Sequence, residues 1–386
     1  MYLHIVHPDP KFPRHIQALF ESVDQGNHMF VFYKTADRLE SFPTGFQNFE
    51  DEESLREIVN SCDDWDGIIL HGVLENIAPY VSILPRVAVG WFFWGFELYK
   101  PAFRNNEGLY GSLTSKLFSR REKQKSFRGN VARIYNKWCE RIKKYESLML
   151  PHVDLVITPF KEEYDLFRKL KIFTNRQQWF NAPTLTLGKM VDLESEIRTA
   201  EGDLDILVGN SAYPTNNHLE VFDKLKDHDL TGRKVVVPLT YGNDTYREKI
   251  LKIGQEMLGD SFDPIIDHLS LTAYLEKVDR CGIVIMNHAR QQAVGNITNA
   301  LWEGKTVYLG KSSLLPGYRN LGFPVRSFQR YFNIERKCAE LAEIQFCREK
   351  LISFVGERAS EENIENLLKT LTRLTNESAR VAVTTL

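Results

Sequence analysis

Short apolar runs rich in β-branched residues alternate with longer amphipathic stretches along the whole chain. In the first half, the runs that predict strands are Tyr2–His7, Met29–Tyr33, Trp65–Leu70, Arg86–Trp91 and Val153–Thr158. The stretches that predict helices are Arg14–Val23, Glu53–Ser61, Asn130–Leu148 and Lys161–Leu170. This alternation is typical of a parallel sheet whose strands are joined by crossover helices.

The same alternation begins again in the second half. Its predicted strands are Leu204–Gly209, Lys234–Leu239, Phe262–Asp267, Gly282–Asn287, Thr306–Leu309 and Phe323–Ser327. Two predicted helices follow, Ile334–Val355 and Ser360–Leu374. Between the halves, Asn181–Gly202 interrupts the pattern with Pro183, Gly188 and charged residues, which indicates a connection between domains.

These patterns predict an α/β protein of two Rossmann-like domains facing a cleft. A length of 386 residues also favours two domains. We expect domains at residues 1–185 and 204–355, a linker at 186–203, and a C-terminal helix and tail at 356–386 that packs back on the first domain. This is the plan of the GT-B glycosyltransferases, although other two-domain α/β proteins share it.

Composition narrows the class of protein. The formal net charge of −2 gives no reason to expect a nucleic-acid partner. No apolar run is long enough to span a bilayer, and the N-terminus does not have the pattern of a signal peptide. The cysteines have no zinc or redox spacing, which favours reduced thiols in the cytoplasm: Cys62, Cys139, Cys281, Cys338 and Cys347.

A polar loop follows the predicted strand that ends at Asn287. We expect a helix to begin at Gly295 or Asn296, where free backbone N–H groups and the helix dipole favour a diphosphate. Arg290 could add a charge-assisted hydrogen bond. Further candidate donor-binding residues on this stretch are Gln291, Gln292 and Asn299. An ordinary loop with a helix cap at Asn296 would explain this stretch equally well.

Two other strands of the second half end in polar turns that contain glycine. The first turn holds Gly209, Asn210 and Ser211, followed by a helix that we expect to be capped near Thr215 or Asn216. The second places Tyr241 where a nucleotide base could stack. Each turn alone could be structural, but polar strand ends of one parallel sheet meet at one edge, which favours a shared ligand.

Together these segments resemble the TDP-4-acetamido-4,6-dideoxygalactose (Fuc4NAc) transferases of enterobacterial common antigen synthesis. The matching residues are Val208–Ser211, Val235–Pro238 with Tyr241 and Asn243, Ala273–Leu275, Ala289–Gly295 (ARQQAVG), Trp94–Gly95 and Glu97–Tyr99. The resemblance implies a GT-B fold, a TDP-sugar donor and an undecaprenyl-diphosphate-linked acceptor. The region from Pro101 to Gly129 departs from the family, which puts the identity of the acceptor in doubt.

The first half holds the candidates for a catalytic base. Glu97 follows an aromatic strand end, and apolar surroundings raise the pKa of a carboxylic acid toward a value suited to a base. His71, at the end of a predicted strand, is the main rival, and His7 is next; either could instead be a structural histidine. Asp63, Asp64 and Asp66 have metal-like spacing but precede a strand, so we expect no metal site there.

The stretch Lys116–Lys144 is strongly basic, with eleven Lys or Arg residues against Glu122 and Glu140. Interleaved aromatic residues make it a candidate for contact with an anionic membrane surface. A solvated basic helix would have the same composition.

We therefore expect a metal-independent glycosyltransferase without a cofactor, located in the cytoplasm at the inner membrane. It would use a nucleotide-sugar donor, bound by the second domain, and a lipid-linked saccharide acceptor. Two alternatives remain: a GT-B transferase with another nucleotide sugar, and a non-catalytic protein that binds a nucleotide sugar.

Overall fold

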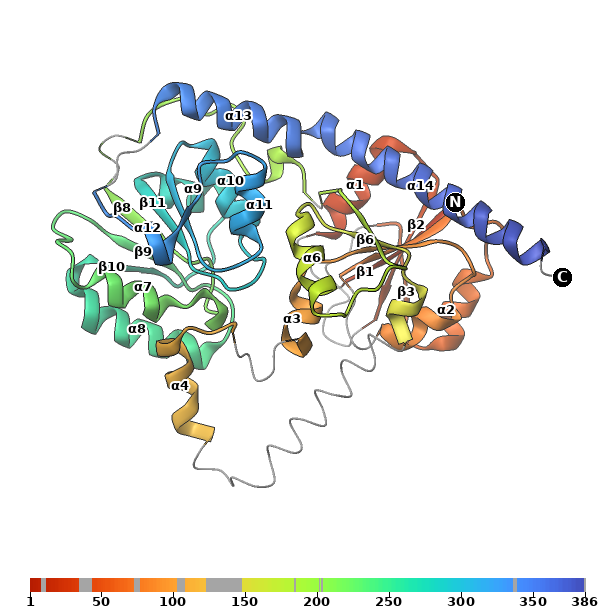
Figure 1. The fold of residues 1–386 in the computed structure, drawn as a ribbon, viewed down its shortest axis with the longest axis horizontal. Helices are drawn as coiled ribbons and strands as arrows, with labels where there is room; N and C mark the ends of the chain where they lie inside the picture. The colour runs from red at the N-terminus through yellow and green to blue at the C-terminus, as the bar shows by residue number, and fades with distance from the viewer. Residues whose placement is uncertain are drawn as a thin grey trace. The chain divides into compact units, whose positions relative to one another are not determined.

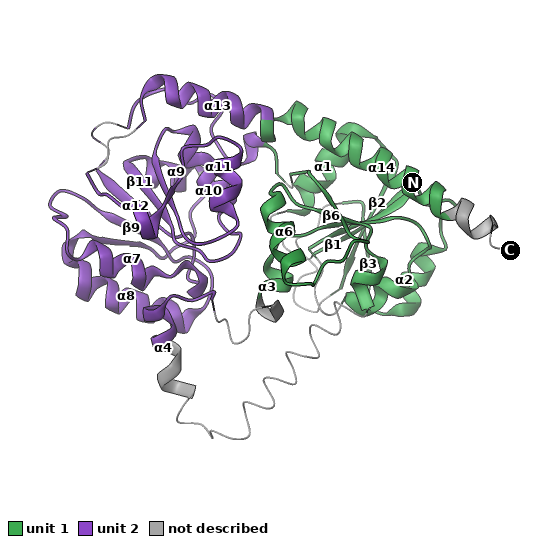
Figure 2. Cartoon of the chain, in the orientation of Figure 1, with its two compact units in different colours: residues 1–102, 133–186, 354–386 green, residues 103–132, 187–353 purple. Residues whose placement is uncertain are grey.

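The computed structural model describes residues 1–7, 12–34, 44–72, 77–102, 108–122, 148–183, 185–200, 202, 204–335 and 339–384. The chain divides into two compact units (Figures 1 and 2). Unit 1 comprises residues 1–102, 133–186 and 354–386, and unit 2 comprises residues 103–132 and 187–353. None of the described helices has both the length and the apolar character that a membrane span requires.

Unit 1 is built on a seven-stranded parallel sheet with the order β3-β2-β1-β4-β5-β6-β7. Its strands are β1 (Tyr2–Val6), β2 (His28–Tyr33), β3 (Phe46–Phe49), β4 (Gly67–His71), β5 (Val89–Phe92), β6 (Leu155–Ile157) and β7 (Gln178–Phe180). Its described helices are α1 (Pro13–Val23), α2 (Glu52–Val59), α3 (Phe96–Ala102), α6 (Lys161–Lys169) and α14 (Glu357–Thr384), with 3-10 turns at Ala78–Ile83 and Leu150–His152.

Unit 2 contains a six-stranded parallel sheet with the order β10-β9-β8-β11-β12-β13. Its strands are β8 (Asp205–Val208), β9 (Val235–Pro238), β10 (Phe262–Ile265), β11 (Cys281–Met286), β12 (Thr306–Leu309) and β13 (Arg326–Ser327). Its described helices are α4 (Ser112–Glu122), α7 (His218–Leu225), α8 (Asp244–Leu258), α9 (Leu271–Asp279), α10 (Val294–Trp302), α11 (Leu314–Asn320), α12 (Phe328–Tyr331) and α13 (Leu341–Val355), with 3-10 turns at Leu187–Lys189, Pro214–Asn216 and Gly259–Ser261.

The predicted fold class is confirmed, because each unit is a parallel sheet with crossover helices. Two edge strands, β3 and β7, were missed; each has only three or four residues and carries polar side chains. Helix α3 was also missed, since aromatic residues and Pro101 obscure its period. The predicted helix Asn130–Leu148 lies almost wholly outside the described residues.

The division of the chain differs from the predicted one in two places. Residues 103–132, which precede the predicted linker, belong to unit 2. Residues 187–200 pack against unit 2 instead of forming a separate linker: the Trp302 indole donates to the carbonyl of Asp192 at 3.0 Å. The guanidinium of Arg348 donates to the carbonyl of Ser195 at 2.6 Å. These bonds hold residues 187–200 on the surface of unit 2.

Helix α14 covers one face of the sheet in unit 1. Its buried side chains recur at helical spacing, at Ile364, Leu367, Leu368 and Leu371. Two strands meet this helix with glycine, and a Cβ at Gly67 would lie 3.0 Å from the Cβ of Leu371. The missing side chains at Gly67 and Gly90 let the helix approach the sheet closely.

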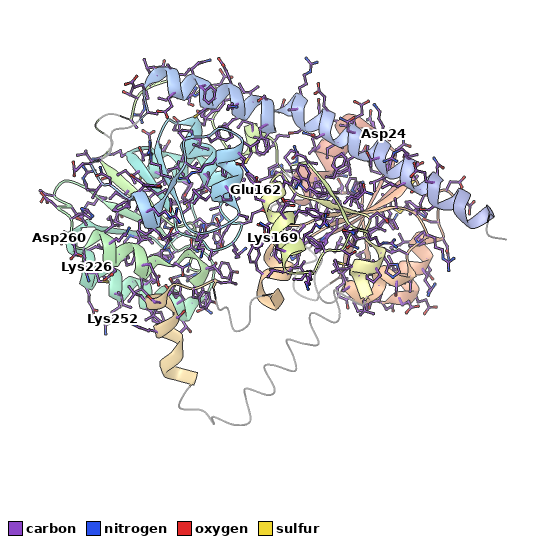
Figure 3. The ribbon with its side chains drawn as sticks, in the orientation of Figure 1. Asp24, Glu162, Lys169, Lys226, Lys252 and Asp260 are labelled. Atoms are coloured by element: carbon purple, nitrogen blue, oxygen red, sulfur yellow. The ribbon has the colours of Figure 1, made fainter. Side chains whose placement is uncertain are left out.

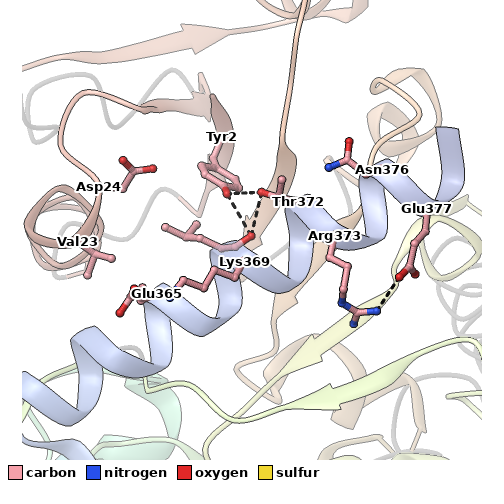
Figure 4. A pocket seen from close by; sticks show the side chains of 10 residues that line it. Tyr2, Val23, Asp24, Glu365, Lys369, Thr372, Arg373, Asn376 and Glu377 are labelled. Atoms are coloured by element: carbon pink, nitrogen blue, oxygen red, sulfur yellow. Dashed lines mark hydrogen bonds and ion pairs between the residues drawn. The ribbon is translucent and has the colours of Figure 1, made fainter. Parts of the chain in front are cut away.

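A hollow of about 690 Å³ lies beside α14 in unit 1 (Figure 4). Most of the charged residues that line it are paired with an opposite charge on the helix, as Lys369–Glu365 and Arg373–Glu377. Tyr2, the first residue of β1, also lines the hollow and donates to the carbonyl of Leu368 at 3.1 Å. The hollow therefore lies at the amino end of the strands, whereas ligands of such sheets bind at the carboxyl ends.

Three histidines form a hydrogen-bonded chain inside unit 1. His4 Nδ1 lies 2.9 Å from His71 Nε2, and His4 Nε2 lies 3.0 Å from His28 Nδ1. Burial, and after it the neighbouring histidines, hold the pKa of His4 well below its ordinary value. Burial, followed by the charge of His28, lowers the pKa of His71 to about 3. These rings are neutral parts of the core, stacked on Phe30 and Phe92.

The exposed charged residues of unit 2 include Lys226, Lys252 and Asp260 (Figure 3). Opposite charges pair locally, as in Lys226 with Asp223, and such exposed pairs contribute little to stability.

Replacement of Leu371 by alanine tests the contact between α14 and the sheet. A buried leucine removed from a packed core costs about 2–5 kcal/mol of unfolding free energy. We expect a corresponding fall in the denaturation midpoint of Leu371→Ala. Lys369→Ala, on the exposed side of the same helix, is the control and should change the midpoint little. Equal midpoints for the two variants would contradict this packing.

The buried histidines predict acid lability. Because their pKa values are lowered in the folded state, the unfolded chain binds more protons below about pH 6.5. The stability they contribute is present above that pH and is lost as the pH falls toward 3, by about 1.4 kcal/mol per pH unit for each site. Urea denaturation between pH 7.5 and 4.5 measures the slope of the unfolding free energy against pH. His71→Gln cannot titrate and should reduce the slope by about one proton; an unchanged slope would show that His71 is not the group responsible.

Candidate functional site

The order of strands in unit 2 defines where a ligand is expected to bind. Strand β8 lies between β9 and β11, so the loops after β8 and β11 leave the sheet in opposite directions. Such a switch point opens a crevice at the carboxyl ends of the strands. The loops that follow β8, β9 and β11 are the three that the sequence predicted to bind the donor.

The turn after β8 depends on glycine. Gly209 has φ +71°, a left-handed conformation that favours glycine. A Cβ there would lie 2.7 Å from both Asn216 Oδ1 and His218 Nε2. No other residue would allow the backbone to turn this closely past the two side chains.

Asn216 is the residue that holds this turn in place. Its buried Oδ1 accepts from the backbone N–H of Asn210 at 2.9 Å and from His288 Nε2 at 2.8 Å. Its Nδ2 donates to Ser211 Oγ at 3.0 Å and to the carbonyl of Tyr213 at 3.0 Å. One side chain thus connects the loop after β8 to the loop after β11. A cap at Asn216 or Thr215 had been predicted; α7 instead begins after Asn217, with no side-chain cap.

The tautomer of His288 follows from this bond. A carboxamide oxygen only accepts, so His288 Nε2 carries the proton. Its Nδ1 is then an acceptor, and it has no hydrogen-bond partner among the described residues. Burial, and after it the charge of Arg290, keep the pKa of His288 well below its ordinary value. His288 is therefore a neutral acceptor beside the turn, a role that sequence reasoning missed.

Further bonds join the predicted donor residues into one network. Gln292 Nε2 donates to Asn210 Oδ1 at 2.9 Å, while its Oε1 accepts from Thr215 at 2.9 Å. Asn210 Nδ2 donates to the Tyr241 hydroxyl at 3.0 Å. Ser211 is fully buried within this network, so its side chain holds the turn together. Gln292 and Ser211 are thus positioned to support the site, while Tyr241 is 41% exposed at its rim.

The helix after β11 begins earlier than predicted. Helix α10 starts at Val294, and its N-cap residue is Ala293, whose methyl side chain cannot cap the helix. Asn296 is therefore not the cap. Ala293 has φ +60°, a conformation that costs about 1–2 kcal/mol for a residue with a Cβ. The first N–H groups of the helix, including that of Gly295, have no capping side chain and could bind an anion.

Gly295 faces open space. A Cβ built there would meet nothing closer than Met190 Cγ, at 3.8 Å. The glycine is therefore not required by protein packing, which fits the expectation that a ligand approaches the backbone here. The next residue, Asn296, donates to the Tyr274 hydroxyl at 3.0 Å. Asn299 lies one turn further along α10 and is half-buried.

Arg290 supplies the positive charge of this edge. Its charge lowers the pKa of the Tyr110 and Tyr241 hydroxyls and of His288, in each case as a smaller effect than burial. For both tyrosines burial is the larger effect and raises the pKa, so the phenols stay protonated near neutral pH. Gln291 is buried beside Arg290, and its Oε1 has no partner among the described residues. Cationic and neutral donors thus gather at one strand edge, as anion binding requires.

The carboxyl edge of the sheet in unit 1 holds the predicted base. Glu97, in the first turn of α3, is 4% exposed, and its Oε1 accepts from the backbone N–H of Trp94 at 3.3 Å. The ring of His7 lies 5.7 Å from that of Trp94 and 5.5 Å from that of Phe96. The structure thus brings Glu97 and His7 to the same aromatic edge.

His71 lies elsewhere in unit 1. Its side chain is fully buried in the histidine chain described above, where it cannot contact an acceptor saccharide. Of the two histidines proposed from the sequence, His7 is therefore the better placed rival to Glu97. The structural interpretation of His71 is favoured.

Two other features predicted from the sequence are the aspartates before β4 and the basic stretch Lys116–Lys144. Asp66 binds the N-terminal amine of Met1 at 2.5 Å, at the amino end of the strands. The basic stretch Lys116–Lys144 lies outside the described residues from position 123 onward.

Comparison with known proteins finds similarity to a glycosyltransferase family and to solved structures. Residues 164–305 match the model of the 4-alpha-L-fucosyltransferase family, glycosyl transferase group 56. Three solved structures are similar over almost the whole chain. They are HepE from Anabaena, solved in complex with UDP (10% identity, TM-score 0.57, 100% of this chain and 99% of that one), the trehalose 6-phosphate synthase of Burkholderia multivorans (8%, 0.58, 100% and 98%) and a mutant O-GlcNAc transferase of Thermobaculum terrenum (11%, 0.56, 99% and 69%).

At these identities the solved structures establish the fold alone, which is the GT-B architecture expected from the sequence. The family match includes the polar loops of unit 2 and confirms the resemblance noted in the sequence. Over residues 164–305 the chain resembles the 4-alpha-L-fucosyltransferase family, glycosyl transferase group 56, and as a whole it has the GT-B fold of glycosyltransferases.

Proposed function

We propose that this protein transfers a 4-acetamido-4,6-dideoxyhexose from a TDP-sugar to an undecaprenyl-diphosphate-linked saccharide during assembly of a surface polysaccharide. The observation that carries the proposal is the coincidence of two features. The family match covers the loops after β8, β9 and β11, and the same loops form the polar network at the switch point. HepE, which shares the fold, was also solved with UDP-glucose, which supports a nucleotide-sugar donor.

The donor diphosphate would lie between Arg290 and the start of α10. The guanidinium, the uncapped N–H groups at Val294–Asn296 and the neutral hydroxyl of Tyr241 would stabilise the charge that develops on the leaving diphosphate. These groups offer that stabilisation without a metal ion, and we propose a metal-independent reaction on this basis.

The acceptor hydroxyl would be activated in unit 1. Its oxygen attacks the anomeric carbon of the donor sugar, the bond from that carbon to the diphosphate oxygen breaks, and the proton passes to the carboxylate of Glu97. TDP leaves with the bonding electron pair. A lipid-linked acceptor also suits the basic stretch Lys116–Lys144, which we propose contacts the anionic cytoplasmic face of the membrane.

The donor assignment is tested by calorimetric titration with TDP, UDP and GDP. We expect TDP to bind most tightly, and Arg290→Ala to weaken it by about tenfold or more, because hydrogen bonds to charged groups contribute about 1.5–3 kcal/mol. Lys252→Ala removes an exposed cation from the same unit and should bind like the wild type. Preference for UDP or GDP would overturn the TDP assignment, and binding without any transfer would favour a non-catalytic protein.

The base assignment is tested by Glu97→Gln, which keeps an oxygen to accept from Trp94 but cannot take a proton. We expect the turnover rate with a lipid-linked acceptor to fall about 10²- to 10⁴-fold, while the dissociation constant for TDP stays unchanged. Glu53→Gln, on the exposed side of α2, serves as the matched control. Transfer by Glu97→Gln at the wild-type rate would refute the role of Glu97 and direct attention to His7.

A further inference from the structure

A short segment from the first half of the sequence is fastened to the donor-binding unit. It comprises Leu109–Leu117 and includes the first turns of α4, which Figure 2 shows with unit 2. Leu113 and Leu117 pack against the core of unit 2, and Lys249 Nζ donates to the carbonyl of Leu117 at 2.9 Å. This segment is therefore an integral part of the donor domain, although residues 133–186 of unit 1 separate it from the rest of that domain in the chain.

Glu220 fixes the start of α4. Its Oε1 accepts from the backbone N–H groups of Leu113 and Thr114, at 2.8 and 2.9 Å, and its Oε2 accepts from the Thr114 hydroxyl at 2.6 Å. The carboxylate thus acts as a helix cap supplied by another element. A Cβ at Gly111 would overlap this carboxylate, so only glycine lets the segment approach so closely.

Asn217 ties the same segment to the loop after β11. Its Nδ2 donates to the carbonyl of Leu109 at 3.1 Å and to that of Asn287 at 3.1 Å, and its Oδ1 accepts from the N–H of Gly111 at 2.8 Å. Asn217 occupies the N-cap position of α7 in a left-handed conformation, yet its side chain does not cap that helix. The side chain is used to hold the segment at the start of the loop that carries Arg290.

Tyr110 lies between the two residues that Asn217 holds. It is half-buried beside the start of the loop that carries Arg290, because Asn217 binds both Leu109 and Asn287. Burial raises the pKa of its hydroxyl, and the charge of Arg290 partly offsets that effect. Tyr241, on the turn after β9, accepts from Asn210, which also binds Gln292 of the Arg290 loop. A guanidinium and two protonated phenols on neighbouring loops supply donors that suit a phosphate group.

We propose that Tyr110 is a further donor-binding residue, whose hydroxyl binds the diphosphate of the nucleotide sugar together with the Arg290 guanidinium. This inference rests on the proposed function, because it assigns a residue to the same donor site. Asn217, Glu220 and Gly111 are positioning residues that deliver Tyr110 to that site.

The test is titration of wild type, Tyr110→Phe and Phe346→Ala with TDP and UDP, and with thymidine and uridine in competition. Removal of the Tyr110 hydroxyl should weaken binding of the preferred diphosphate by about three- to tenfold, the effect of one hydrogen bond, and leave nucleoside binding unchanged. Phe346→Ala removes an exposed ring on α13 and should match the wild type. Thermal unfolding without ligand checks that each variant is folded.

Two further results decide the pairing with Arg290. In an Arg290→Ala background, Tyr110→Phe should change diphosphate affinity by less than about twofold, because the two groups share one partner. Gly111→Ala should weaken diphosphate binding while leaving Tyr110 itself intact. If wild type binds neither TDP nor UDP, the proposed function fails; if wild type binds but Tyr110→Phe binds equally well, or loses nucleoside affinity to the same extent, only the assignment of Tyr110 is overturned.

Discussion

The buried carboxamide of Asn216 is the interaction on which the candidate donor site depends. Its oxygen and nitrogen together hold the turn at Gly209–Ser211 and the ring of His288. Buried polar groups that lose a partner cost about 1–3 kcal/mol, so breaking any bond of this network is unfavourable. The surrounding groups can then be pre-organised for a diphosphate before any ligand arrives, which is how electrostatic stabilisation of a leaving group becomes effective.

The neighbouring residues Asn216 and Asn217 bind different partners in the candidate donor site. Asn216 binds within the loops of unit 2, whereas Asn217 reaches the segment that contains Tyr110. Neither caps α7 with its side chain. An asparagine side chain at a helix start usually accepts a hydrogen bond from one of the following backbone N–H groups. Neither asparagine does so here, which indicates that another constraint outweighs helix stability. That constraint is the joining of loops which the chain order keeps far apart.

Unit 1 uses its polar residues differently. Its buried histidines bond to one another and remain neutral, which makes them structural parts of the sheet. Glu97 and His7, by contrast, lie at the carboxyl edge among Trp94 and Phe96. His71 is the last residue of β4, whereas His7 follows the end of the adjacent strand β1, so His7 is the one that lies at the edge where a substrate is expected.

The sequence by itself determined the class of fold, most strands, and the loops that form the candidate donor site. These follow from the period of apolar residues and from glycine and polar residues at strand ends, which are local signals. It could not determine which polar side chains hold the loops and which face a ligand, as Ser211 and Gln292 illustrate. Nor could it place Tyr110 in the second domain or bury His71. Those outcomes depend on contacts between residues distant in the chain, such as Asn217 with Leu109, which only the tertiary structure decides.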